Sequence, residues 1–304
     1  MLTRRRALLL AGLAFVSAGT SANSQDKTQG KIKVVATFSI LGDLVKNVGG
    51  DRVEAVTLVG PNSDAHVFSP TPADAGTLAA AKLVFVNGLG LEGWITRLVK
   101  ASGTRVPTVV ASKGIKSRKM EDEDHPGKEV TDPHAWQSIA NAKIYVANIR
   151  DGLSKADPAG KGTYEFNAKV YLARLDELEW EVTAAIKRIP ADHRKIITTH
   201  NAFGYFGAAY GLEFIAPEGV STDSEPSAKD VAKIIAQVRR QKIPAVFMEN
   251  ISDPRLMQQI AKETGARIGG TLYSDALSDS KGPAGSYIDM IRNNIRELLA
   301  TSRV

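Results

Sequence analysis

Short runs of β-branched and apolar residues alternate along the chain with segments whose apolar positions recur every three or four residues. The short runs are typical of buried parallel strands, and the segments between them are typical of amphipathic helices. This alternation predicts an α/β fold with two lobes, each a mostly parallel four-stranded sheet flanked by helices. The predicted strands are 33–38, 53–59, 83–87 and 107–111 in the first half, and 195–199, 212–215, 245–249 and 267–272 in the second.

The two halves of the chain resemble each other at a spacing of 162 residues. The first strand of each half leads into an apolar helical pattern, with Ser39 or Asn201 as the expected N-cap. Each half also has a helix that starts with a hydroxyl N-cap and a carboxylate three residues later. These pairs are Thr71 with Asp74 and Ser227 with Asp230. These capping pairs are 156 residues apart, which implies a length difference of six residues between the halves, and the spacing of 162 returns at the strands 83–87 and 245–249. A register shared by two separate blocks favours a duplicated lobe over the alternative, the repeated local patterns of any α/β protein.

One long helical pattern lies between the halves. Pro158 precedes it and Pro190 follows it. A helix over 161–189 has about 29 residues and a length of roughly 44 Å, enough to join two lobes and fix their separation. An ordinary packed surface helix is the alternative. We therefore expect an N-terminal lobe over 31–150, a linking helix over 160–189 and a C-terminal lobe over 194–304.

Residues 1–22 have the pattern of a secretory signal peptide that is removed on export. A basic segment, Arg4–Arg6, precedes an apolar run over 7–18, and Thr20-Ser21-Ala22 forms a small-residue cleavage site. The arginines also loosely fit a twin-arginine signal, so the Sec and twin-arginine routes both stay open. No later stretch approaches 18 uninterrupted apolar residues. We expect an exported, soluble protein of the periplasm.

The amino-acid composition excludes several kinds of metal site and of binding partner. The chain has no cysteine, which excludes a disulfide framework and thiolate metal ligands, and predicts that no lipid anchor is present. Any bound metal must then be held by nitrogen and oxygen atoms. Without residues 1–22, which hold three arginines and no acids, the formal charge falls from +6 to 36 − 33 = +3. Basic and acidic residues are interspersed, so we expect no nucleic-acid partner.

Residues that could bind a metal ion lie at or after the expected carboxyl ends of strands. His66 follows the second predicted strand, and His134 follows the fourth strand and a long loop. His200 ends the first strand of the second half, and Asp275 ends its fourth. Ligands of open α/β sheets collect at these ends, so two facing lobes would bring the four side chains into one cleft. A shared metal site and separate structural hydrogen bonds are both compatible with this placement.

Four ordered motifs are more specific than this placement. They are PNSDAHVFSPTP at 61–72, NGLGLEGW at 87–94, DPHAW at 132–136 and THNAFGYF at 199–206. Together they resemble the zinc/manganese solute-binding proteins of bacterial ABC importers (the metal-binding cluster A-I family) over about residues 31–302. The resemblance implies two α/β lobes joined by one rigid helix, one divalent metal ion between them, and delivery of that ion to an ABC permease in the inner membrane.

By resemblance, the metal ligands are His66, His134, His200 and Asp275. Three imidazoles and one carboxylate suit tetrahedral Zn²⁺, and the Irving–Williams order favours zinc over manganese at a nitrogen-rich site. We therefore expect zinc as the cargo, with manganese as the alternative if Asp275 binds through both oxygens. Asn201 stands where many relatives have Asp. We also expect a monomer, with a periplasmic metallochaperone as a further candidate partner.

A short acidic loop is a second, weaker candidate. The loop over 116–130 contains Asp122, Asp124 and His125, at a place where zinc-specific relatives often carry a long His-rich insertion. These three side chains are candidates for collecting cations. A solvated loop without a role in binding is the alternative.

An enzyme and a surface adhesin are the alternatives to a binding protein. Three histidines on zinc with an open position for water would form a hydrolytic site. Asp275 as a fourth ligand closes that position, and neither His-Glu-x-x-His nor a nucleophile elbow occurs in the sequence. We therefore expect no enzymatic activity. An adhesin is expected even less, because a chain without a lipidation cysteine has no evident means of staying on a surface.

Overall fold

Two parallel sheets organise the part of the chain that the computed structural model describes, residues 30–121 and 127–302. Their strands are β1 (Ile32–Phe38), β2 (Val53–Val59), β3 (Leu83–Val86), β4 (Thr108–Val110), β7 (Lys195–Ile197), β8 (Glu213–Ile215), β9 (Ala245–Glu249) and β10 (Arg267–Leu272). The strand orders are β2-β1-β3-β4 in the N-terminal lobe and β10-β9-β7-β8 in the C-terminal lobe. Neighbouring strands pair in parallel within each sheet. The predicted fold class is confirmed.

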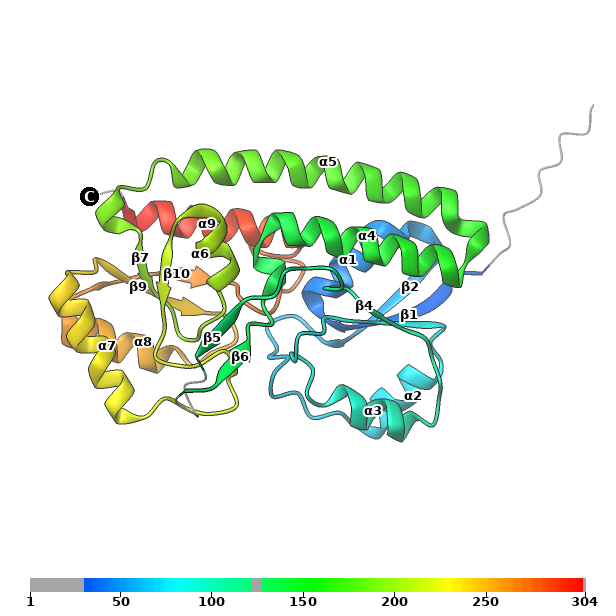
Figure 1. The fold of residues 1–304 in the computed structure, drawn as a ribbon, viewed down its shortest axis with the longest axis horizontal. Coiled ribbons are helices and arrows are strands. Elements are labelled where there is room, and N and C mark those ends of the chain that lie inside the picture. Colours follow the sequence, from blue (N-terminus) through cyan, green and yellow to red (C-terminus); the bar gives the residue numbers. More distant parts are fainter. Residues whose placement is uncertain (1–29, 122–126, 303–304) are drawn as a thin grey trace, which may run out of the picture. The chain divides into compact units, whose positions relative to one another are not determined.

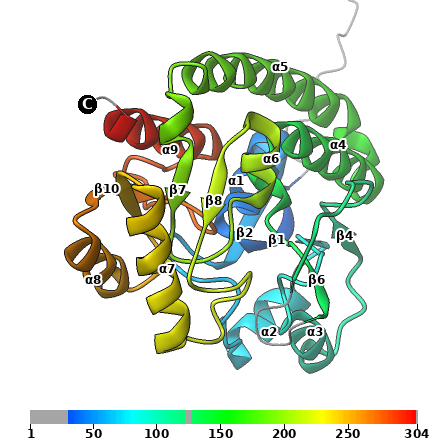
Figure 2. The same ribbon diagram turned by 60° about the vertical axis from the view of Figure 1, so that its left-hand side comes forward.

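Helices cover both sheets (Figures 1 and 2). The longer ones are α1 (Ser39–Gly49), α2 (Pro72–Ala79), α3 (Ile95–Ser102), α4 (Ile139–Ala156), α5 (Lys161–Ile186), α6 (Gly204–Tyr210), α7 (Ala228–Gln241), α8 (Pro254–Thr264) and α9 (Tyr287–Ser302). Short 3₁₀ turns are η1 (Gly50–Arg52), η2 (Ala135–Gln137), η3 (Pro158–Gly160) and η4 (Ala191–His193). Within the described ranges, no helix combines the length and the apolar character that a membrane crossing needs.

The long helix α5 runs past both lobes (Figure 1). It packs against α1 and α4 of the N-terminal lobe and against α9 of the C-terminal lobe. Its 26 residues end at Ile186, three residues before the predicted end. The backbone N–H of Ile189 instead closes a tight turn onto the carbonyl of Ile186 at 3.0 Å. Pro190 follows at once, and a proline disfavours helical geometry in the residue before it. The predicted helix therefore exists and is one turn shorter.

Helix starts were predicted with mixed success. Both predicted capping pairs form, since Thr71 and Ser227 each accept a hydrogen bond from the backbone N–H three residues later. The caps predicted at Ser39 and Asn201 are wrong, because α1 begins at Ser39 itself and α6 begins only at Gly204. The Ser39 hydroxyl instead accepts the backbone N–H of Leu277 at 2.9 Å, a contact between the lobes.

Two short paired strands lie within or at the end of the segment predicted as a loop over 116–130. They are β5 (Lys119–Glu121) and β6 (Glu129–Thr131), which pair antiparallel with Met120 opposite Val130. Each of these strands has a single apolar residue, Met120 or Val130, between polar neighbours, so neither shows the apolar run by which the other strands were predicted.

Candidate metal centre

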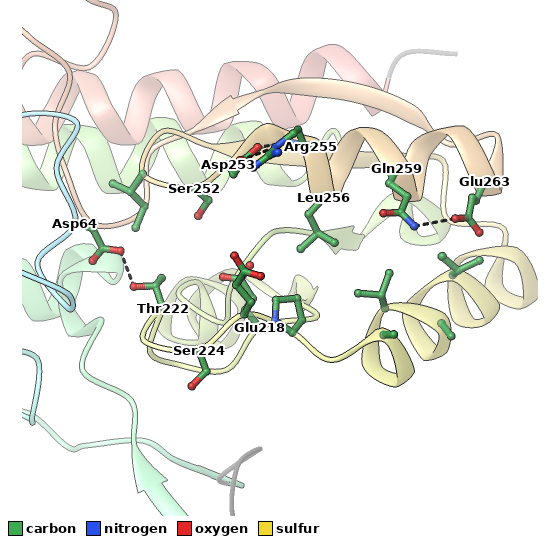
Figure 3. A pocket seen from close by; sticks show the side chains of 17 residues that line it. Asp64, Glu218, Thr222, Ser224, Ser252, Asp253, Arg255, Leu256, Gln259 and Glu263 are labelled. Carbon is green, nitrogen blue, oxygen red and sulfur yellow. Dashed lines mark hydrogen bonds and ion pairs between the residues drawn. The ribbon is translucent and has the colours of Figure 1, made fainter.

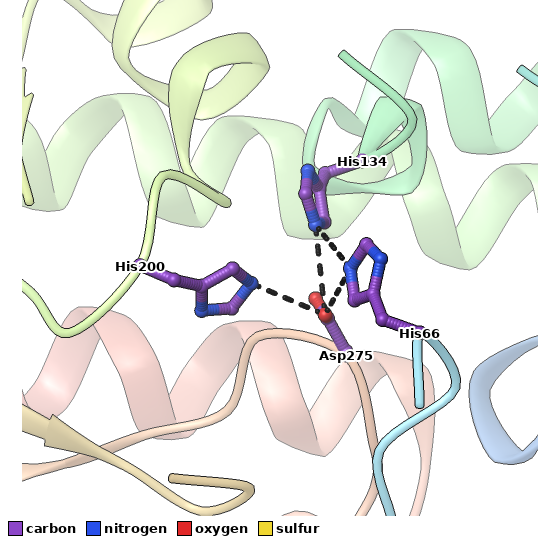
Figure 4. A group of neighbouring side chains, drawn as sticks. All are labelled: His66, His134, His200 and Asp275. Atoms are coloured by element: carbon purple, nitrogen blue, oxygen red, sulfur yellow. Dashed lines mark hydrogen bonds and ion pairs between the residues drawn. The ribbon is translucent and has the colours of Figure 1, made fainter. Parts of the chain in front are cut away.

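Loops that follow strands bring His66, His134, His200 and Asp275 together (Figure 4). His66 lies in the loop after β2, and His134 stands between β6 and η2. His200 comes three residues after the end of β7, and Asp275 three residues after the end of β10. One nitrogen or oxygen atom from each of these side chains lies within 4.8 Å of the other three. The structure thus joins four residues from distant parts of the sequence in one cluster.

The atoms that face one another are the Nε2 atoms of the histidines and Oδ2 of the aspartate. Asp275 Oδ2 lies 3.1 Å from His66 Nε2 and 3.5 Å from His134 Nε2. The same oxygen lies 3.2 Å from His200 Nε2. The Nε2 atoms of His66 and His134 are also 3.2 Å apart. Atoms that surround one zinc ion tetrahedrally, with bonds of about 2.0–2.1 Å, are about 3.3–3.4 Å apart, close to these separations.

Two of the histidines contact a second carboxylate at the opposite nitrogen of the ring. Asp132 Oδ1 lies 2.9 Å from His134 Nδ1 and also accepts the backbone N–H of His134 at 3.0 Å. Glu249 Oε2 lies 2.7 Å from His200 Nδ1. Its Oε1 accepts the backbone N–H groups of Thr199 and His200 at 2.8 and 3.0 Å. A carboxylate at Nδ1 fixes the ring, leaves Nε2 for an ion and makes that nitrogen a stronger ligand.

The buried carboxylates control the charge of the cluster. Burial raises the pKa of Asp275, but the neighbouring histidines outweigh this effect and hold its pKa well below the ordinary value. Burial lowers the pKa of His134, but Asp275 and Asp132 outweigh it and raise that pKa to about 9. For His200, burial likewise lowers the pKa, while Glu249 and Asp275 bring it well above the ordinary value. The metal-free site therefore holds protons at neutral pH.

Two tryptophans fix the loops on which the cluster depends. The indole N–H of Trp94 donates to the carbonyl of Ala65, the residue before His66, at 2.9 Å. The indole N–H of Trp136 donates to the carbonyl of Ser274, the residue before the aspartate of the cluster, at 2.9 Å. Both indoles are almost completely buried. Each of these loops is therefore held one residue away from a candidate ligand.

Some predicted residues lie outside the part of the chain that the structure describes, and two residues at the site were not predicted. Asp122, Asp124 and His125 of the acidic loop lie outside the described residues. Asp132 and Glu249 were missed by the sequence analysis. Two signals were available for them: a carboxylate two residues before a histidine in the DPHAW motif, and a carboxylate at the end of a buried strand.

Comparison with known proteins identifies the family. The family model described as "ZnuA: Zinc-uptake complex component A periplasmic" matches residues 34–301. The chain belongs to this family. Among solved structures, the periplasmic zinc binding protein TroA from Treponema pallidum is similar to it with a TM-score of 0.83 and 30% identity, over 90% of this chain and 99% of that chain.

Curated relatives of this ZnuA-family chain carry the names of other metals. The iron-binding protein YfeA of Yersinia pestis is 34% identical over 295 residues, which cover 96% of this chain and 94% of the relative. The manganese ABC transporter substrate-binding lipoprotein PsaA of Streptococcus pneumoniae is 33% identical over 297 residues, or 95% of this chain and 94% of the relative. The chain is thus a metal-binding, substrate-binding protein of the ABC-transporter type. Its relatives are named for different metals, so their names do not identify one metal as the cargo of this chain.

The predicted localisation is wrong. The absence of cysteine predicts a free periplasmic protein without a lipid anchor, yet PsaA, which matches 95% of this chain, is named a lipoprotein. The absence of cysteine therefore does not distinguish this chain from relatives that are named lipoproteins. Residues 1–29, which include the predicted signal peptide over 1–22, lie outside the described residues.

Proposed function

We propose that this chain captures one Zn²⁺ ion with His66, His134, His200 and Asp275 and hands it to a membrane permease. The convergence of four ligand atoms from these side chains within 4.8 Å carries the proposal. Three neutral imidazoles and one carboxylate form a donor set that zinc prefers in tetrahedral geometry. A permease follows as the partner, because substrate-binding proteins of ABC transporters deliver their cargo to one.

The nitrogen-rich donor set favours zinc over manganese. Zinc binds nitrogen ligands more tightly than manganese does. Manganese prefers more oxygen ligands and a higher coordination number. The Oδ1 atom of Asp275 is buried and has no hydrogen-bond partner among the described residues. This oxygen can add a fifth contact to an ion held by Oδ2, so manganese is the alternative cargo. Relatives named for manganese and iron support that alternative.

The same geometry supports capture rather than catalysis. A catalytic zinc ion keeps one position open for a water molecule, whereas Asp275 supplies a fourth protein ligand here. His134, His200 and Asp275 have no exposed surface, so solvent reaches the cluster poorly. We propose no enzymatic activity for this member of a transport family. That the protein is a monomer and that a metallochaperone loads it stay predictions.

Competitive metal titration tests the choice of metal. Metal-free protein is titrated with zinc against a chelator of known affinity, and the bound zinc is then challenged with manganese. We expect one zinc ion per chain and a zinc affinity at least about 100-fold above that for manganese. Equal affinities for the two ions would show that the choice of zinc is wrong.

A pair of histidine variants tests the ligand assignment. His200→Ala removes one ligand, so zinc affinity should fall by at least about 100-fold. His193→Ala is the matched control, because His193 precedes β7 whereas His200 follows it. The control should stay within about twofold of the unaltered protein. If His200→Ala also stays within that range, His200 is not a ligand.

A further inference from the structure

The loop that carries His66 is bonded to the C-terminal lobe through Asp64. The Thr222 hydroxyl, in the segment between β8 and α7, donates to Asp64 Oδ2 at 2.5 Å. The other oxygen, Oδ1, accepts the backbone N–H of His66 at 2.8 Å. One carboxylate therefore connects the backbone of a metal-site histidine to the opposite lobe. Figure 3 shows this contact at one end of the cleft between α7 and α8.

The side chain of His66 has less support than those of the other two histidines. His134 and His200 each contact a carboxylate through Nδ1. Across residues 30–121 and 127–302, no carboxylate contacts Nδ1 of His66. Its side chain is also 5% exposed, whereas the other two have no exposed surface. The position of His66 therefore depends mainly on the backbone of its own loop.

The start of the same loop is bonded to the C-terminal lobe as well. The backbone N–H of Asn62 donates to the carbonyl of Leu277 at 2.9 Å. The side-chain amide of Asn250 donates to Asn62 Oδ1 at 3.2 Å. Asn62 has a positive φ of 51°, a conformation that asparagine tolerates better than most residues. The loop thus follows the C-terminal lobe at Asn62 and at Asp64, although it extends from a strand of the N-terminal lobe.

We infer that the bond between Thr222 and Asp64 is a latch that holds His66 in the metal site. This inference rests on the proposed function. Thr222 and Asp64 are positioning residues, because both act through the backbone of His66. When the segment that carries Thr222 moves, Asp64 loses its partner in the other lobe and His66 becomes the first ligand to leave. The latch therefore controls how fast metal dissociates more than how fast it binds.

The Thr222→Val variant tests the latch, because valine has nearly the shape of threonine and lacks the hydroxyl. Zinc-loaded protein is mixed with an excess of a fluorescent zinc chelator, and the rate of metal transfer is measured. We expect transfer to be about tenfold faster, since a hydrogen bond to a charged group is lost, with the rate of zinc binding changed by less than about twofold. Thr222→Ser keeps the hydroxyl and loses the methyl group, so it should transfer zinc at the original rate.

Further variants separate the latch from a packing effect. Ser224→Ala alters an exposed residue of the same segment and should leave the rate unchanged. Asp64→Ala removes both bonds and should accelerate transfer more than Thr222→Val does. A Thr222→Val rate within about twofold of the original, or an equally fast Thr222→Ser, overturns the latch. If the unaltered protein takes up neither zinc nor manganese, the proposed function fails; if it binds one ion and only the Thr222 result is negative, the latch alone is wrong.

Discussion

At the level of single residues, opposite charges face each other in the candidate metal centre. Asp275 has no exposed surface, and an isolated carboxylate removed from water is costly. His134 and His200 contact it on one side, and each contacts a further carboxylate on the other. Protons on the imidazoles balance these carboxylates when no ion is bound. In the proposed function a divalent ion would replace them, so we expect the site to exchange protons for metal.

Metal affinity should rise with pH. The raised pKa of His134, about 9, means that its imidazole is protonated at neutral pH in the metal-free protein. Each proton that must leave makes the apparent dissociation constant fall about tenfold per pH unit, until the pH passes that pKa. Calorimetric titration at about pH 7.5, in two buffers with different ionisation enthalpies, should detect at least one proton released per ion.

A variant of the carboxylate that contacts His200 Nδ1 provides the control for this pH dependence. Glu249 is one of the two carboxylates that raise the pKa of His200. Glu249→Gln should therefore lower the number of protons released and weaken zinc binding by about 10- to 100-fold. Binding without proton release in the unaltered protein would contradict the proton–metal exchange.

At the scale of elements, a buried polar cluster ties the start of α5 to the N-terminal lobe. Asp157, just before η3, accepts the Tyr164 hydroxyl at 2.6 Å and Arg52 Nε at 3.0 Å. Burial raises the pKa of Asp157, while Tyr164 and Arg52 outweigh it and lower this pKa below its ordinary value. Because Arg52 lies in η1 beside β2, the cluster joins the start of the long helix to the first sheet.

Loss of this cluster should destabilise the fold. Asp157→Ala removes the acceptor of two buried or half-buried donors, so the free energy of unfolding should fall by about 2–3 kcal/mol in urea denaturation of the metal-free protein. Since the pKa of Asp157 is lowered in the folded state, this stabilisation is complete above the ordinary pKa of 3.8 and is lost as the pH falls through the folded value.

An exposed ion pair on the same helix is the matched control. Asp176 of α5 lies 2.7 Å from Lys143 Nζ, and its side chain is 71% exposed. Asp176→Ala should cost only about 0–1 kcal/mol, because solvent screens the pair. Equal losses in the two variants would contradict a special role of the Asp157 cluster.

At the scale of the whole molecule, the two lobes contact each other around the metal centre. The Tyr287 hydroxyl, on α9, donates to the carbonyl of Trp136 at 2.7 Å, and Ser39 bonds to Leu277 across the same junction. The largest cluster of buried apolar residues also includes members of both lobes. These contacts, together with α5, favour small movements of loops over wide hinge opening. We therefore expect metal binding to change stability more than shape.

Zinc should stabilise both lobes in one transition. At a free zinc concentration of about 100 times the dissociation constant, binding adds about 2.7 kcal/mol, which raises the melting temperature of a chain of this length by about 5 °C. Because the proposed ligands come from both lobes, scanning calorimetry should show one transition that moves as a whole. Asp275→Asn should remove most of the increase. Two transitions, only one of which shifts with zinc, would show that the ion does not join the lobes.

Features that depend on near neighbours in the chain could be predicted from the order of residues alone. Short apolar runs identified the eight strands of the two parallel sheets, and apolar positions that recur every three or four residues identified the long helix, because both patterns follow from local burial. The capping pairs at Thr71 and Ser227 were predictable for the same reason, since a cap and its partner lie three residues apart. The strand-end positions of the three histidines and Asp275 indicated a possible common site. The motifs around the histidines indicated that this site binds a metal ion.

Which of these residues meet, and which contacts hold them, depends on how distant segments pack. The contacts of Asp275 with His66, of Glu249 with His200 and of Thr222 with Asp64 cross between loops far apart in the chain, the last over 158 residues. The role of the Ser39 hydroxyl changed from a local cap to a bond between lobes for the same reason. Such contacts depend on how the two sheets and α5 pack. Packing between elements far apart in the chain produces no regular pattern in the sequence, so these contacts could not be predicted from it.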